Sequence, residues 1–295
     1  MRTTRRKRRS RSRWTLSAFG FAAASVVAAG GIGFAVVQDA NSAKPDVLGC
    51  YAPETASTAV LVDSSVPRWG ATQQSDLLTF LSQLYEEGLA FNERFSMFLT
   101  AEDRIGTIPP PVLEFCGHAR TPRELEDIGA ARQEAPYLRR KSAKFRREVF
   151  DKILGEVFAL TATKGNTQWV ESPVLEQVQA ISRLPQFADF EERSLVVVSD
   201  FLQNTKDAQF CGTKGHLPPF ASFRETAYYK RIAPKSLAGV RVTMLALVRD
   251  EIGGPGLPYC SEDELYGFWE AFFRAAGAES VEVIRLRVGR VTAEG

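Results

Sequence analysis

Ala59-Val60-Leu61-Val62-Asp63-Ser64-Ser65 is a short apolar run that ends in a carboxylate and two hydroxyls. Ser194-Leu195-Val196-Val197-Val198-Ser199-Asp200 shows the same pattern further along the chain. Unbroken apolar runs of this length indicate strands buried on both faces of a parallel sheet. Ligands of open α/β sheets bind at the carboxyl ends of such strands. The two stretches therefore predict an α/β fold with a candidate site at Asp63 and Asp200.

Strand patterns and helix patterns alternate through the rest of the chain, which is typical of a doubly wound fold. Arg285 and Arg287 interleave with the apolar residues of the last strand and favour an edge position for it. The six expected strands cover residues 59–64, 94–101, 111–116, 194–199, 240–248 and 280–288.

Start and stop signals locate the helices between these strands. Ser172 and Pro173 match an N-cap followed by proline at the first helical position. Ser261 and Glu264 match a capping box. The expected helices cover residues 73–90, two pieces of 121–160 separated at Pro136, a helix opening at Ser172-Pro173, 222–232, and a helix from Ser261 to Gly277.

Charge is unevenly distributed along the 295 residues. The overall content of 44% hydrophobic and 24% charged residues is that of a globular protein. Residues 1–13 hold eight Lys or Arg and no acid, whereas residues 45–295 hold 28 basic and 34 acidic residues. The acidic balance of this larger part argues against nucleic-acid binding.

An uncharged stretch of 24 residues, 14–37, follows the basic head. As a helix it spans roughly 36 Å, enough to cross a hydrocarbon core of about 30 Å. The basic head is expected to stay cytoplasmic and the remainder to face outward. Ala40-Asn41-Ser42 offers the alternative of a cleavable signal peptide. We expect a basic head at 1–13, a transmembrane helix at 14–37, a linker at 38–58 and one domain at 59–290.

Four cysteines follow the apolar stretch, at Cys50, Cys116, Cys211 and Cys260. None belongs to a C-x-x-C motif, and His118 and His216 are the only histidines, which argues against a structural zinc site. An even number of cysteines in an oxidising compartment favours disulfides over free thiols.

Several segments together resemble a von Willebrand factor A-type (vWA) domain. They are VLVDSS at 60–65, SPVLEQVQAI at 172–181, VVVSD at 196–200, and FWEAFFRAAGA at 268–278 with VEVIRL at 281–286. The resemblance covers about residues 55–290 and is strongest to bacterial vWA proteins tethered by one N-terminal helix. It implies a six-stranded sheet of order 3-2-1-4-5-6 with strand three antiparallel, helices on both faces, and Asp63 beside Asp200. It also implies a single-pass protein of the bacterial inner membrane with a periplasmic C-terminal domain.

The family binds a divalent cation at the carboxyl ends of the central strands, which we call the mouth of the sheet. The site is a metal-ion-dependent adhesion site with a D-x-S-x-S motif. By resemblance Asp63 and Ser65 take the first two ligand positions, Ser172 takes that of a distant threonine, and Asp200 takes the last. Pro67 replaces the third hydroxyl, so the ligand set is degenerate. Two interpretations stay open. The residues hold Mg²⁺ or another divalent cation weakly, or they form a metal-free cluster of cap and turn residues.

The resemblance also implies a disulfide pairing. In the vWA topology Cys50 and Cys116 lie at the amino-terminal end of the sheet, and Cys211 and Cys260 lie at the mouth. The implied pairs are Cys50–Cys116 and Cys211–Cys260.

The residues after the expected anchor contain no nucleophile motif such as G-x-S-x-G and no phosphate-binding loop. We therefore expect that this chain is not an enzyme. The two histidines are interpreted as structural or surface residues. The resemblance and the anchor imply an adaptor that binds another protein through loops 202–220 and 251–260. The apolar residues expected on these loops are Phe210, Phe220, Leu257 and Tyr259. The alternatives are a structural subunit of an envelope or secretion-type assembly, and a Mg²⁺-assisted phosphoester hydrolase using Asp63 and Asp200.

Overall fold

The computed structural model describes residues 42–65, 69–100, 110–163, 171–211, 217–248 and 260–286. The basic head, the expected transmembrane segment 14–37 and Pro67 lie outside these ranges. Within them, no helix has the length and apolar character needed to span a bilayer.

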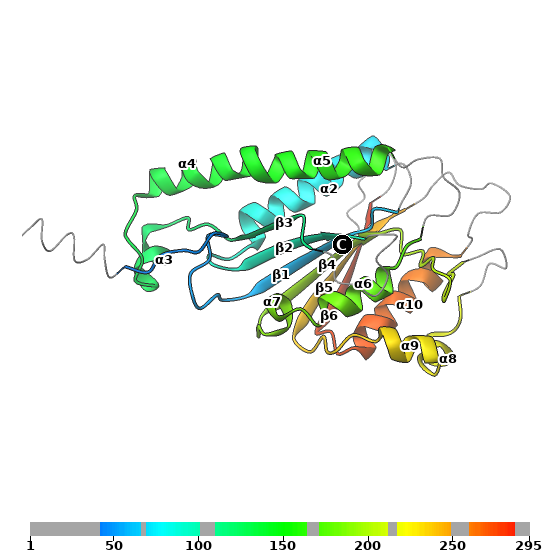
Figure 1. The fold of residues 1–295 in the computed structure, drawn as a ribbon. Coiled ribbons are helices and arrows are strands. Elements are labelled where there is room, and N and C mark those ends of the chain that lie inside the picture. The colour runs from blue at the N-terminus through cyan, green and yellow to red at the C-terminus, as the bar shows by residue number, and fades with distance from the viewer. Residues whose placement is uncertain are drawn as a thin grey trace, which may run out of the picture.

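Six strands form one sheet in the order β3-β2-β1-β4-β5-β6, which confirms the expected topology (Figure 1). Neighbouring strands are parallel except β2 and β3, which are antiparallel. The strand β6 lies at the edge, as its interleaved charges predicted. The strands are β1 (Ser57–Val62), β2 (Arg94–Leu99), β3 (Leu113–Cys116), β4 (Arg193–Ser199), β5 (Val240–Leu247) and β6 (Ser280–Leu286).

Helices cover both faces of this sheet (Figure 1). One face is covered by α2 (Ala71–Gln83), the π-helical turns η1 (Leu84–Gly88) and η2 (Arg146–Phe150), and α5 (Asp151–Thr163). The other is covered by α6 (Val174–Ile181), α7 (Pro185–Ala188), α8 (Phe220–Arg224), α9 (Ala227–Ile232) and α10 (Glu262–Ala275). Two further helices, α3 (Pro122–Asp127) and α4 (Ala135–Phe145), lie near the amino-terminal end of the sheet.

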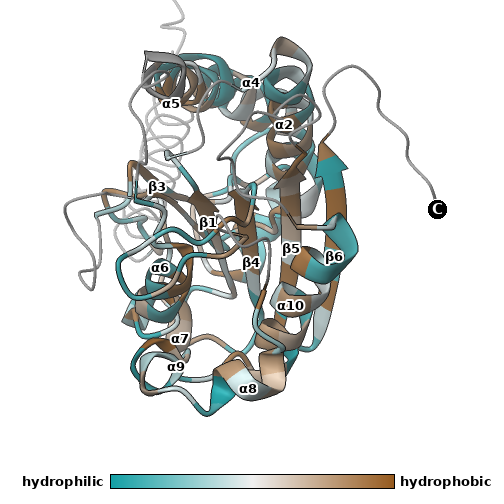
Figure 2. Ribbon diagram, turned by 90° about the vertical axis from the view of Figure 1, so that its right-hand side faces the viewer, coloured by the Kyte–Doolittle hydropathy of each residue, from teal (hydrophilic) through white to brown (hydrophobic). Residues whose placement is uncertain are grey.

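The central strands are apolar on both faces, and this produces two cores (Figure 2). Side chains alternate across a strand, so Ala59 and Leu61 of β1 belong to the core under α6 and α10. Val60 and Val62 belong to the core under α2 and α5. The unbroken apolar run of β1 is therefore explained by burial on both sides.

Several helices differ from the expectations. Pro136 is the second residue of α4, so it begins this helix after a loop and does not break a longer one. The expected helix 222–232 is two helices, α8 and α9, because the Thr226 hydroxyl accepts a hydrogen bond from the Tyr229 N–H (3.0 Å) and starts a new helix. The short helix α7 has no counterpart among the expected elements.

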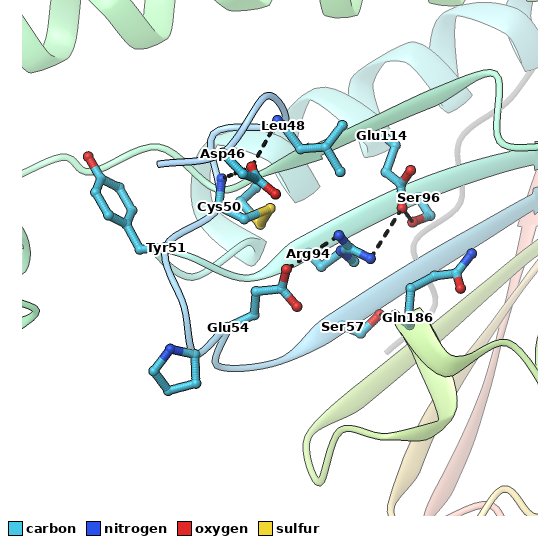
Figure 3. A network of polar contacts seen from close by, with 12 residues as sticks. Asp46, Leu48, Cys50, Tyr51, Glu54, Ser57, Arg94, Ser96, Glu114 and Gln186 are labelled. Carbon is cyan, nitrogen blue, oxygen red and sulfur yellow. Dashed lines mark hydrogen bonds and ion pairs between the residues drawn. A yellow bond between two sulfur atoms is a disulfide. The ribbon is translucent and has the colours of Figure 1, made fainter. Parts of the chain in front are cut away.

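Part of the expected linker is packed on the domain, and we call residues 42–56 the docked segment (Figure 3). Cys50 is bonded to Cys116 at the end of β3. The Asn92 side chain donates to the carbonyls of Tyr51 (2.7 Å) and Pro53 (2.9 Å). Arg94 of β2 forms ion pairs with Glu54 (3.3 Å) and with Glu114 of β3 (3.6 Å). Packing of the domain therefore extends back to residue 42.

Candidate functional site

The carboxyl ends of β2, β1 and β4 lie side by side and form the mouth of the sheet (Figure 1). The ladder continues one residue beyond β1, because the Asp63 N–H donates to the carbonyl of Val198 on β4 (2.8 Å). The Thr100 N–H donates in the same way to the carbonyl of Val62 (3.0 Å). These bonds fix the backbones of Asp63, Thr100 and Ser199 next to one another.

Asp63 is fully buried and accepts five hydrogen bonds. Its Oδ1 accepts from the Ser65 N–H (2.9 Å), the Ser65 hydroxyl (2.6 Å) and the Thr100 hydroxyl (3.1 Å). Its Oδ2 accepts from the hydroxyls of Ser172 (2.8 Å) and Ser199 (2.7 Å). We call these five residues the Asp63 cluster. A carboxylate offers about four lone-pair sites, so the donors saturate this one.

Backbone contacts fix the direction of two of these hydroxyls. The Thr100 hydroxyl oxygen accepts the Ser64 N–H (2.9 Å), and the Ser199 hydroxyl oxygen accepts the Phe201 N–H (2.9 Å). Each hydroxyl then has its proton available for Asp63. Among the described residues no Lys or Arg forms an ion pair with Asp63. Its charge is therefore balanced by oriented dipoles.

Ser172 does not cap a helix, contrary to the expectation. The N-cap of α6 is Pro173, and the helix begins at Val174. The Ser172 hydroxyl donates to Asp63, and its backbone forms an isolated bridge with Asn204 (N–H to carbonyl, 2.7 Å). The Leu175 N–H is satisfied instead by the side-chain carbonyl of Gln203 (3.0 Å). An N-cap hydroxyl accepts a helix N–H, whereas the Ser172 hydroxyl serves as a donor to the buried carboxylate.

Asp200 lies at the same mouth, one residue beyond the contact that Asp63 makes with Ser199. Its Oδ1 accepts the Leu202 N–H (3.0 Å), which is the hydrogen bond of an Asx turn. The next residue, Phe201, has φ of 61°, and its carbonyl accepts the Trp269 indole N–H (2.8 Å). The turn after β4 is therefore held by α10.

Sequence reasoning missed Thr100 and Ser199 as members of the site. Ser199 was part of the quoted β4 pattern, but only the register of β1 with β4 shows that its hydroxyl reaches Asp63. Thr100 directly follows β2, and a residue at the end of a strand next to β1 was the signal that could have found it.

A second buried polar network lies behind the mouth. The Tyr228 hydroxyl donates to the Glu176 carboxylate (2.6 Å), and the Gln203 amide donates to the other Glu176 oxygen (2.8 Å). Burial, followed by the nearby Glu176 charge, raises the pKa of Tyr228. Because Gln203 also accepts the Leu175 N–H, the network ties the loop after β4 to the start of α6.

Both implied disulfides are present, Cys50–Cys116 and Cys211–Cys260. Cys211–Cys260 joins the loop after β4 to the residue before the N-cap of α10. Cys50, Cys116 and Glu54 lie close enough together to suggest a metal site, but bonded sulfurs are not thiolate ligands.

Phe210 is not on the surface, contrary to the expectation. Its side chain is buried and packs on Phe268 (ring centroids 4.7 Å apart) and Phe223 (5.9 Å). Phe220 packs against the same core and is partly buried. The two other residues expected there, Leu257 and Tyr259, lie outside the described ranges, as does His216. We call the loops around the mouth its rim, and residues 202–211 are the part of it that the structure describes here. These residues instead expose polar side chains, namely Lys206, Asp207 and Gln209.

His118 lies far from the mouth, at the amino-terminal end of the sheet. It packs against Phe145 (centroids 4.6 Å apart), its Nδ1 lies 3.5 Å from the Tyr85 hydroxyl, and it lines a cavity of about 50 Å³ with Lys141. Burial, followed by the positive charge of Lys141, lowers the pKa of His118 to about 4.

The lowered pKa of His118 predicts loss of stability in acid. The unfolded chain takes up this proton near pH 6.5 and the folded chain only near pH 4, so stability falls across that window. Between pH 7.5 and pH 5 we expect His118 to cost about 2 kcal/mol. Urea titrations of the full chain and of His118→Gln at both pH values measure this difference. An equal acid response of the two proteins would contradict the prediction.

No family model matches this chain, and no curated protein matches it. Solved structures that are similar to it include the following two. One is the conserved hypothetical protein BatB from Bacteroides thetaiotaomicron, with TM-score 0.34 and 11% identity over 78% of this chain and 90% of that chain. The other is an aerotolerance-related membrane protein from Bacteroides fragilis with multiple mutations to serine. It has TM-score 0.32 and 11% identity over 77% of this chain and 91% of that chain. At these TM-scores neither likeness bears on function.

Proposed function

We propose that this chain is a membrane-anchored, vWA-like module that faces the periplasm and binds another protein at the mouth of its sheet. The observation that carries the proposal is the Asp63 cluster, a buried carboxylate with converging hydroxyls at the ends of three adjacent strands. Clefts at this switch point are where open α/β sheets bind ligands. The basic head and the uncharged stretch 14–37 support the anchor, and two disulfides suit an oxidising compartment.

The rim of the mouth is held in place by three contacts, two to the region of α10 and one to α6. Cys211–Cys260 closes it toward α10, the Glu176 network ties it to α6, and Trp269 holds the Phe201 carbonyl. A rigid surface loses little conformational entropy when it binds a partner. These contacts support the loop 202–211 as the described part of a docking surface.

The donor set at the mouth suits a hard cation in its chemistry, since it consists of carboxylate and hydroxyl oxygens. Both Asp63 oxygens are already occupied by donors, whereas Ser65 and Ser172 donate only one proton each and keep oxygen lone pairs. Ser65, Ser172 and Asp200 are the residues that would hold the ion. When bound, the ion would supply a positive charge for an acidic side chain of the partner.

We expect this cation to bind weakly, with a Kd above about 1 mM, because a ligand is lost at Pro67 and Asp63 is saturated. Calorimetric titration of the detergent-solubilised full chain with Mg²⁺ and Mn²⁺ measures the affinity, with Ser172→Ala as the comparison. A micromolar Kd that Ser172→Ala weakens would contradict the saturated cluster.

A charge reversal on the rim tests the proposed partner surface. Lys206 is exposed on the loop after β4, and Lys235 is exposed at the opposite, amino-terminal end of β5. We expect Lys206→Glu to reduce the partner recovered with the full chain from gently solubilised, cross-linked membranes by about tenfold, since one misplaced rim charge costs on the order of 1 kcal/mol or more.

The matched variant Lys235→Glu makes the same change in charge and should leave recovery unchanged. Equal recovery of the partner with both variants would exclude the mouth as the binding surface. Equal recovery together with a large, stoichiometric assembly would favour the structural-subunit alternative. A hydrolase is less well supported, because the carboxylate such chemistry needs is already saturated by hydrogen bonds.

A further inference from the structure

A strongly basic helical surface lies on the outside of the domain, away from the mouth. Residues 135–150, which form α4 and η2, contain six Arg or Lys and a single acid, Glu148, within an otherwise acidic domain. Five of the six basic side chains are exposed, and we call these the basic face: Arg139, Arg140, Lys141, Lys144 and Arg147.

Most of this charge is not neutralised within the domain. Among the described residues Arg139, Arg140 and Arg147 form no ion pair. Lys144 reaches Glu148 at 3.7 Å, but both side chains are mostly exposed, so the pair is weak. Like charges three and four residues apart destabilise a helix. Repulsion within the basic face therefore lowers the stability of this helix, and no ion pair of Arg139, Arg140 or Arg147 with the described residues compensates for it.

The opposite side of α4 and η2 fixes the direction of the basic face. Leu138 and Phe150 are buried, and Phe145 packs on Phe115 (centroids 4.8 Å apart). Arg146, the sixth basic residue, is turned inward and pairs with Glu86 and with Asp151. The helix cannot rotate to hide the basic face without exposing these apolar side chains.

The chain reaches the domain beside the first turn of this helix. Ala43 packs into the same small apolar cluster as Leu138, and its N–H donates to the carbonyl of Gly129 (2.9 Å). Figure 1 shows α4 starting at the end of the molecule where the described chain begins. Residues 38–42 alone separate Ala43 from the uncharged stretch 14–37, and five extended residues reach at most about 18 Å.

We propose that the basic face lies on the anionic head groups of the bilayer that holds residues 14–37. This inference rests on the membrane anchor of the proposed function. A tether of about 18 Å keeps the first turns of α4 within roughly two Debye lengths of the lipid surface, where basic side chains bind anionic lipids. The short connection favours a bilayer over nucleic acid or an acidic protein as the partner. The chain itself keeps the basic face close to the bilayer, whereas it keeps neither of the other two nearby.

The contact sets the orientation of the mouth. In Figure 1 α4 and α5 run along the sheet in the direction of the parallel strands. With α4 lying on the bilayer, the mouth opens sideways, along the membrane surface. The partner surface is then presented to proteins that project from the same membrane.

Lysine labelling of the full chain in lipid nanodiscs tests the contact. Lys141 and Lys144 belong to the basic face, whereas Lys230 and Lys235 lie on other surfaces and serve as internal controls. We expect acylation of Lys141 and Lys144 to be about fivefold slower in discs containing phosphatidylglycerol than in pure phosphatidylcholine. The protection should disappear at about 0.5 M NaCl, and the two control lysines should not respond.

Matched variants separate this contact from general charge effects. Arg139→Gln/Arg140→Gln/Arg147→Gln should abolish the lipid-dependent protection of Lys141 and Lys144. Arg183→Gln/Arg224→Gln/Arg241→Gln removes three exposed charges elsewhere and should keep the protection.

The possible failures are distinguishable. Equal labelling in both lipids, with the chain retained in the discs, would overturn the contact and leave the anchor standing. Loss of the chain from the discs would overturn both. Protection by double-stranded DNA, without protection by anionic lipid, would overturn the bilayer as the partner.

Discussion

Replacing Asp63 with alanine is expected to lower the free energy of unfolding by about 3–4 kcal/mol. The substitution removes the acceptor of five hydrogen bonds and leaves the hydroxyls of Ser65, Thr100, Ser172 and Ser199 buried together. Each buried donor without an acceptor costs about 1–3 kcal/mol, reduced where a hydroxyl finds another partner.

Two comparison variants show whether hydrogen bonding causes the loss. Asp63→Asn keeps one acceptor oxygen and the side-chain shape, so it should cost less than Asp63→Ala, about 1–2 kcal/mol. Asp189→Ala removes an exposed carboxylate and should change stability by less than about 0.5 kcal/mol. Urea unfolding of the full chain, followed by tryptophan fluorescence, measures all three.

The same series separates the two interpretations of the mouth. If a bound cation held the cluster together, EDTA would destabilise the native chain about as much as Asp63→Ala does. The saturated carboxylate predicts that EDTA leaves the urea midpoint unchanged. A large effect of EDTA, or an Asp63→Ala variant as stable as the native chain, would contradict the hydrogen-bonded cluster.

The central sheet was predictable because its strands carry their own signal. β1 and β4 are apolar on both faces, and this pattern occurs where helices cover both sides of a parallel sheet. The order of the strands came from the vWA resemblance, since nothing in the strand sequences states which neighbours pair. Once the order is known, the meeting of Asp63 with Ser199 follows from register.

What the sequence missed depends on long-range contacts. Ser172 matches a helix cap locally, but the N-cap is Pro173, and the Ser172 hydroxyl donates a hydrogen bond to the buried Asp63 carboxylate, 109 residues away. Phe210 occurs in a polar loop, but it packs with Phe268 and Phe223 because the loop folds back over α10. Segment 38–58 has the composition of a linker, yet its later part is held by a disulfide and by Asn92. In each case the deciding partner is distant in sequence.

Trp269→Ala is expected to be the most destabilising single substitution in α10, at about 4–5 kcal/mol. The side chain is fully buried and packs on the rings of Phe201 (centroids 5.3 Å apart) and Phe273 (5.9 Å). Truncation leaves a large cavity and also leaves the Phe201 carbonyl without its indole donor. Urea unfolding of the full chain measures the loss.

Trp269→Phe isolates the part of this effect that concerns the mouth. Phenylalanine keeps most of the packing but removes the hydrogen bond to Phe201, whose φ of 61° is unfavourable for an aromatic residue. We expect a smaller loss of stability, about 1–2 kcal/mol, with faster amide exchange concentrated in residues 201–205. Exchange in β6, which also packs against α10, is the internal reference.

The indole hydrogen bond reaches the turn directly after Asp200. Faster amide exchange in both segments to the same extent would mean that Trp269 supports only the core. Acceleration confined to the turn would mean that α10 sets the geometry of the mouth.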